Sequence, residues 1–127
     1  MKSRETTIRL KRFHVDEKRR QAVQIETMIA EFERMAADLD REINVEQERA
    51  GISDPAHFAY PTYAKAARQR RDNLVRSAGD LKQQLADARA AFDDALEELK
   101  KVEALDERDH GREQAVLVAA DVARARV

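Results

Sequence analysis

The side chains best suited to catalysis or metal binding are few in this 127-residue sequence, and they lie far apart along it. The histidines are His14, His57 and His110, and cysteine is absent, which excludes a disulfide scaffold, a thiol nucleophile and a zinc–cysteine site. The sequence contains no phosphate-binding loop, no catalytic pair and no spacing typical of a metal site. We therefore expect no enzymatic activity, no metal and no cofactor.

The carboxylates are numerous, but they alternate with basic side chains: 25 Asp and Glu stand against 24 Lys and Arg, for a net charge of -1. This pattern is typical of the solvated face of a long helix. A protein dedicated to nucleic acid is usually strongly basic, so no nucleic-acid partner is expected. The longest apolar run is too short to cross a bilayer, and MKSRETTIRLKRFHVDEKRR lacks the apolar core of a signal peptide. The sequence therefore predicts a cytoplasmic protein without membrane insertion.

Only one segment has the composition of a loop, because both prolines fall in GISDPAHFAYP. Gly51 suits the left-handed residue just past a helix end, and Asp54-Pro55 suits the start of a short turn. Abundant Ala, Leu and charged residues with few helix breakers are typical of long helices elsewhere. The predicted organisation is a single domain of residues 1–127, with a helix over about 4–50, a turn over about 51–61 and a helix over about 62–127.

Apolar residues recur in both helices at alternating spacings of three and four, which is a strong sign of a coiled coil. Because one turn joins the helices, the predicted fold is all-α, an antiparallel two-helix coiled-coil hairpin with an overhanging C-terminal helix. The predicted seam between the helices consists of Val15, Ala22, Ile25, Ile29, Phe32, Ala36, Leu39, Ile43, Ala78, Leu81, Leu85, Ala88, Phe92, Ala95, Leu99 and Val102.

The register of the hairpin is predicted from how side chains match across this seam. One register sets large against small residues, for example Ile29 against Ala88. A slip of one heptad either way sets seam charges against apolar residues, and polar seam residues commonly fix register. The favoured register joins opposite charges in three layers: Arg4 with Glu113, Lys11 with Asp106, and Glu46 with Arg71.

The charges of the two helices are complementary in this arrangement. Residues 1–20 contain eight basic and three acidic side chains, whereas residues 87–109 contain four basic and nine acidic ones. An antiparallel hairpin lays these segments side by side, while a parallel homodimer would set the basic segment against its own copy. We therefore expect an intramolecular hairpin that is monomeric in isolation.

The two ends of the predicted hairpin are apolar. Aromatic residues at the turn either plug the open end of the coiled coil or bind a partner, and both can be true. The last residues of the second helix are rich in Val and Ala and extend past the first helix, so they bind a partner, fray or self-associate. The predicted tip residues are Ile52, Phe58, Tyr60, Tyr63 and Leu74, and the predicted overhang residues are Val116, Leu117, Val118, Val122 and Val127.

These features together resemble the FliJ family of the flagellar type III export apparatus. The segments that carry the resemblance are MKSRETTIRLKRFHVDEKRR at the start and GISDPAHFAYPTYAKAARQRRDNL at the turn, and they look like the alphaproteobacterial branch of the family. The resemblance covers the whole chain, and the turn segment is its most specific part.

The resemblance implies a non-enzymatic stalk. FliJ proteins are similar in architecture to the coiled-coil stalk of the rotary ATPase gamma subunit, and they promote assembly of the hexameric export ATPase FliI. They also engage the export gate protein FlhA and escort substrate-specific export chaperones. The resemblance thus implies a cytoplasmic protein peripheral to the inner-membrane export apparatus. The alternatives are a generic structural or adaptor coiled coil and a small helical holdase unrelated to flagella.

Overall fold

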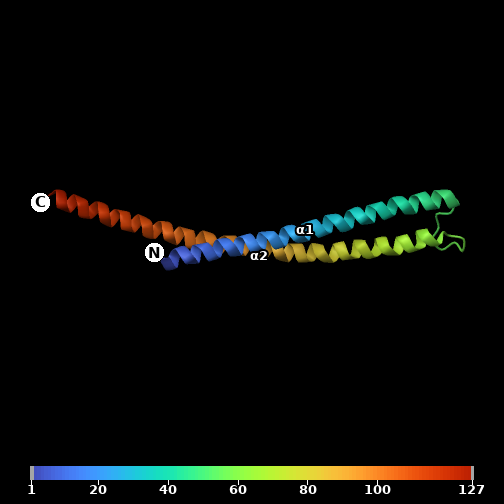
Figure 1. Ribbon diagram of the computed structural model, residues 1–127, viewed down its shortest axis with the longest axis horizontal. Helices are drawn as coiled ribbons and strands as arrows, with labels where there is room; N and C mark the ends of the chain where they lie inside the picture. Colours follow the sequence, from blue (N-terminus) through green and yellow to red (C-terminus); the bar gives the residue numbers. More distant parts are fainter. Residues whose placement is uncertain (1, 127) are drawn as a thin grey trace. The chain divides into compact units, whose positions relative to one another are not determined.

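The computed structural model describes residues 2–126, which form two α-helices joined by a turn and contain no β-strand. Helix α1 spans Lys2–Ala50, and helix α2 spans Thr62–Ala125. The helices run in opposite directions and pack against each other, with the turn joining the end of α1 to the start of α2 (Figure 1). The predicted all-α antiparallel hairpin is therefore confirmed, and the predicted helix bounds agree closely with the observed ones.

The hairpin divides into two compact units, and each unit contains a stretch of both helices. The first unit comprises α1 up to Arg20 and α2 from Arg89 onward, and the second comprises Gln21–Ala88 with the turn. Each unit has its own contacts between α1 and α2, described separately below. That the whole chain is a single domain stays a prediction.

The turn forms as its residue types predict. Gly51 has a φ of 68°, the left-handed conformation that glycine adopts most readily, and its amide donates a hydrogen bond to the Gln47 carbonyl at 2.9 Å. The Asp54 Oδ1 atom accepts a hydrogen bond from the Ala56 amide at 2.9 Å, which folds the loop into a tight turn. The second helix then begins directly after Pro61, the last residue of the loop.

The predicted seam forms the core of both units, since all of its residues are buried or half-buried. Apolar side chains cluster at the spacing that places them on one side of each helix. One cluster of the second unit consists of Ala22, Ile25, Ile29, Phe32, Leu81, Leu85 and Ala88. Nearer the turn, a second cluster consists of Leu39, Ile43, Ala67 and Leu74. The cluster of the first unit consists of Ile8, Val15, Phe92, Ala95, Leu96 and Leu99.

The register of the hairpin differs from the predicted one by one heptad. Ile43, which was predicted to face Leu74, shares a cluster with Ala67, seven residues nearer the turn. The contact of Gln47 with Tyr60 agrees with this closer register, since its Nε2 atom donates to the tyrosine hydroxyl at 2.8 Å. The two helices consequently stay in contact closer to the turn than predicted.

Two of the predicted charge layers are therefore wrong in the first unit. Arg4 binds Asp106 at 3.4 Å and Asp109 at 2.6 Å, whereas it was predicted to face Glu113. The Nζ atom of Lys11 lies 3.9 Å from a carboxylate oxygen of Glu98 and not against Asp106. Glu113 lies 3.9 Å from the Nδ1 atom of His110 on its own helix.

The third predicted layer, Glu46 with Arg71, is also wrong. The guanidinium of Arg71 binds Asp40 and Asp72, each at 2.9 Å. These hydrogen bonds, first that with Asp40 and then that with Asp72, raise the pKa of Arg71 above its ordinary value. Glu46 pairs with Arg49 on its own helix at 3.3 Å.

Long basic side chains explain why the charge argument favoured the wrong register. A lysine or arginine stem can lie along apolar surface and carry its charge to a carboxylate at the edge of the seam, as Lys11 and Arg71 do. Such a residue needs no carboxylate directly opposite. In the observed register Tyr60 is only 7% exposed and fills the layer beside the turn. The predicted register leaves that layer open.

The complementary charges of the two segments do meet in the first unit. Besides the contacts of Arg4 and Lys11, Arg12 lies 3.3 Å from Glu103 on α2. Each of these pairs is partly or largely solvent-exposed, and such pairs contribute roughly 0–1 kcal/mol each. These ion pairs therefore add little to the free energy of unfolding. Their main effect is to favour the antiparallel arrangement over a parallel one.

Candidate partner-binding surfaces

The tip of the hairpin presents one aromatic ring to solvent. Phe58 is 96% exposed and stacks on His57, with ring centroids 4.9 Å apart and an angle of 19° between the planes. His57 is itself fixed, because its Nδ1 atom accepts a hydrogen bond from the Ala59 amide at 3.0 Å. Ile52 is half-buried in the same loop. The loop therefore holds Phe58 in place as a ready anchor for a partner.

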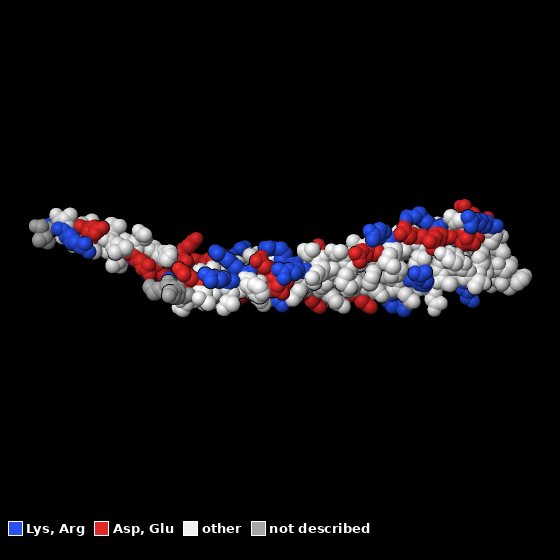
Figure 2. Space-filling view, in the orientation of Figure 1, with Lys and Arg blue, Asp and Glu red and all other residues white. Residues whose placement is uncertain are grey.

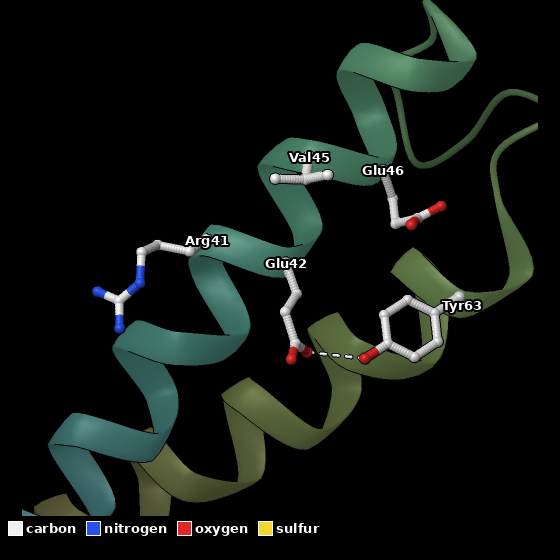
Figure 3. A pocket seen from close by; sticks show the side chains of 5 residues that line it. All are labelled: Arg41, Glu42, Val45, Glu46 and Tyr63. Atoms are coloured by element: carbon white, nitrogen blue, oxygen red, sulfur yellow. Dashed lines mark hydrogen bonds between the residues drawn. The ribbon is translucent and has the colours of Figure 1, made fainter.

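Beside the tip, a shallow groove lies between the two helices (Figure 3). It has a volume of about 370 Å³ and is lined by Arg41, Glu42, Val45, Glu46 and Tyr63. The Tyr63 ring reaches from α2 toward α1, and its hydroxyl donates a hydrogen bond to the Glu42 Oε2 atom at 2.7 Å. Tyr63 and Val45 are both exposed, so the groove offers an aromatic ring and an aliphatic side chain beside a carboxylate.

Two of the five predicted tip residues are core residues instead. Tyr60 is buried and holds Gln47, so it plugs the end of the coiled coil, which is one of the two roles predicted for the turn aromatics. Leu74 is half-buried against the cluster of Leu39 and Ile43, because its heptad position places it on the seam side of α2. Neither residue is available to bind a partner at the tip.

The hydrogen bond of Tyr63 has a consequence that can be measured. Donation to the Glu42 carboxylate, with smaller effects from desolvation and from the negative charge, raises the pKa of Tyr63 above its ordinary value of 10.0. A pKa that is raised on folding gives a stabilisation that is complete below pH 10 and is lost as the pH rises through the folded-state value. In a spectrophotometric titration, the Glu42→Gln variant should show a lower pKa for Tyr63. The Tyr63→Phe variant identifies the part of the absorbance change that comes from Tyr63. An unchanged titration curve in Glu42→Gln would contradict the contact.

The overhang is the part of α2 that extends beyond the described part of α1. Because Arg4, near the start of α1, lies against Asp106 and Asp109, the overhang begins about one heptad earlier than predicted. It is helical through Gly111 as far as Ala125. Val127, one of the five predicted binding residues, lies outside the described residues.

The apolar residues of the overhang are on more than one side of the helix. The exposed fractions of Val116, Leu117, Val118 and Val122 are 68, 60, 60 and 48%. Because consecutive residues are about 100° apart around a helix, the first three alone cover more than half of its circumference. In Figure 2 most of the overhang is uncharged, with acidic side chains gathered at its base. A helix with apolar residues on several sides is typically surrounded by other parts of a protein or by a partner.

Two exposed methionines, Met28 and Met35, are absent from the predicted site residues. They lie one heptad apart on α1, immediately beside the seam. That spacing is visible in the sequence and could have marked them as a surface stripe. Their exposure could not be read from the sequence, since it depends on which residues of α2 lie opposite.

Comparison with models of protein families, with curated proteins and with solved structures finds no match for this chain. Within residues 2–126, neither helix has a stretch long and apolar enough to cross a bilayer. Nor do the described residues place three or more His, Asp or Glu side chains where they could hold a metal ion together.

Proposed function

We propose that this chain is a FliJ-like component of the flagellar type III export apparatus, a non-enzymatic stalk in the cytoplasm beside the inner membrane. In this role it binds and promotes assembly of a FliI-like export ATPase hexamer and links it to a FlhA-like export gate. Escort of substrate-specific export chaperones is part of the same proposal. Support comes from the resemblance of its sequence segments together with an antiparallel hairpin whose two ends differ in chemistry.

The observation that carries the proposal is the distribution of apolar residues around the overhang. Val116, Leu117 and Val118 point in different directions around the helix, so a partner that lies along one face would leave some of them in water. A ring that encloses the helix can cover all of them. The hexameric export ATPase is the ring that the family resemblance supplies.

The tip is assigned to the second partner, the export gate. Phe58 is exposed and held by its loop, and the neighbouring groove contains Val45 and Tyr63. Such a site, with exposed aromatic residues and an aliphatic side chain bordered by charges, suits a protein–protein contact of limited area. It lies in the second unit, whereas the overhang lies in the first, so the two contacts can be tested separately.

Truncation after Arg112 should weaken binding to the export ATPase by at least about tenfold while leaving gate binding within about twofold, since about 1.4 kcal/mol corresponds to a factor of ten. The truncation removes the exposed apolar residues of the overhang and leaves the described contacts of α1 with α2 in place. Binding to the purified ATPase and to the cytoplasmic part of the gate is measured by isothermal titration, and stimulation of ATP hydrolysis is measured in parallel.

The matched control is Phe58→Ala, which should show the opposite pattern, with weaker gate binding and unchanged ATPase binding. Circular dichroism of both variants establishes that the hairpin remains folded. Equal loss of both partners in the truncated protein would refute this assignment of the two ends. No binding of the intact protein to either partner would leave a generic adaptor coiled coil as the better description.

A further inference from the structure

The two long edges of the hairpin differ in the second unit, Gln21–Ala88. Along one edge, ion pairs bridge the helices: Lys82 binds Glu33 at 3.0 Å, and Arg71 binds Asp40 at 2.9 Å. Glu33 and Asp40 are one heptad apart and therefore lie on the same side of α1. We name this side the closed edge.

The opposite side, which we name the open edge, is marked by the hydrogen bond of Glu42 with Tyr63. Met35 and Met28 lie one and two heptads before Glu42 and so occupy the same edge of α1. Their exposed fractions are 42 and 43%, and that of Tyr63 is 52%. The closed edge has one exposed apolar side chain, Val75, between its two ion pairs, whereas the open edge has several and no ion pair among the described contacts between the helices.

The half-buried seam residues lie on the side of the open edge, where Leu39, Ala67 and Leu81 are buried. Seam residues beside the closed edge, such as Ile29 and Ala36, are buried. The half-buried seam residues of this unit are Ile25, Phe32, Leu74 and Ala88, and all of them occupy the heptad position that adjoins the open edge. The open edge thus presents the exposed parts of Phe32 and Leu74 beside the two methionines.

Acidic residues border the open edge on both helices. Glu31 and Asp38 are three residues beyond Met28 and Met35, which makes them neighbours on the outer side of α1. Asp80 and Asp87 have the corresponding positions on α2, and all four are exposed. Arg41 pairs with Asp38, and Arg70 lies near Tyr63 at the end next to the turn, so the negative charge is strongest away from the turn.

We propose that the open edge binds one amphipathic helix of a partner protein, with apolar residues on the bound face and Lys or Arg on both flanks. A third helix laid along the open edge would bury Met28, Met35 and the exposed parts of Phe32 and Leu74, as in a three-helix bundle. Methionine suits such a site because its flexible side chain adapts to the surface of the partner. The acidic borders select a basic partner. The open edge adjoins the tip at Tyr63, but its Met28 and Met35 belong neither to the tip nor to the overhang, so the inference goes beyond the proposed function.

The test uses the full chain and two synthetic helical peptides of about 18 residues, or roughly five turns. Both carry leucine at the spacing of a single helical face, and they differ only in having Lys or Glu at the flanking positions. Binding is measured by fluorescence anisotropy of the labelled peptide. The Lys-flanked peptide should bind at least about tenfold more tightly than its Glu-flanked twin, a difference of about 1.4 kcal/mol.

The variant Met28→Glu/Met35→Glu should weaken binding of the Lys-flanked peptide by at least about tenfold, a difference of about 1.4 kcal/mol. The control is Val75→Glu, which places a charge at an exposed position of α2 one heptad before Lys82 of the closed edge and should leave binding unchanged. A second variant, Glu31→Lys/Asp80→Lys, should reverse the preference toward the Glu-flanked peptide. Circular dichroism verifies that each variant remains helical.

Three results would overturn the proposal. The first is equal binding of the two peptides, and the second is equal loss of binding in the methionine variant and in Val75→Glu. The third is self-association of the intact chain, measured by light scattering, that Met28→Glu/Met35→Glu abolishes. That last result would make a second copy of this chain the occupant of the open edge.

Discussion

Cysteines introduced at Ala22 and Ala88 should form a disulfide within one chain under mild oxidation, whereas cysteines at Ile29 and Ala88 should not. The register shown by the contacts of Ile43 with Ala67 and of Gln47 with Tyr60 places Ala22 opposite Ala88. Ile29 is one heptad further along α1, which displaces it by about 10 Å. A disulfide tolerates Cα separations of only about 4.4–6.8 Å. The outcome is therefore close to all-or-none.

The chain contains no cysteine, so each double variant has a single possible intramolecular pair. Non-reducing electrophoresis and mass spectrometry after digestion distinguish an intramolecular disulfide from a dimer. Ready oxidation of the Ile29 and Ala88 pair, with none for Ala22 and Ala88, would restore the register favoured by the charge layers. Exclusively inter-chain products in both variants would replace the hairpin with an extended dimer.

Leu85→Asp should destabilise the hairpin by at least about 3 kcal/mol, the second large effect that the structure predicts. Leu85 is buried in the cluster that also contains Ile29 and Leu81. The substitution removes an apolar side chain from the seam and places an unpaired carboxylate there, and both changes are costly. A small two-helix protein has little stability to spare, so we expect loss of cooperative thermal unfolding as monitored by circular dichroism.

Val75→Asp is the matched control, because Val75 is exposed on the same helix. Valine and aspartate have similar helix propensities, so this variant should unfold within about 1 kcal/mol of the parent protein. Similar losses in the two variants would show that helix propensity, and not burial in the seam, sets the stability. A stable Leu85→Asp protein would contradict the cluster itself.

The seam and the helix ends could be predicted because they depend on local rules. A spacing of three and four residues puts Val15, Ala22 and Ile29 on one side of a helix whatever lies opposite. Gly51 and Pro61 end one helix and precede the next through their own backbone preferences. The seam residues and the helix ends can therefore be predicted without knowing which residues meet across the hairpin.

The candidate surfaces were only partly predictable, as two aromatic residues of the same loop illustrate. Phe58 and Tyr60 are two residues apart and were assigned the same role, yet Phe58 is exposed and Tyr60 is buried. The difference arises from the path of the turn, which directs Tyr60 toward Gln47 on α1. The exposed apolar residues of the overhang were predictable because few charges accompany them in the sequence.

The sequence by itself determined that this protein is a helical hairpin, which residues form its seam and where its helices end, because helical periodicity and turn chemistry act over a few neighbouring residues. Only the tertiary structure decided the register. Neighbouring registers of an antiparallel coiled coil all match apolar with apolar positions. They differ in which carboxylates the long side chains of residues such as Lys11 and Arg71 can reach past the seam. That choice also decided where the overhang begins and which side chains meet along each edge of the hairpin.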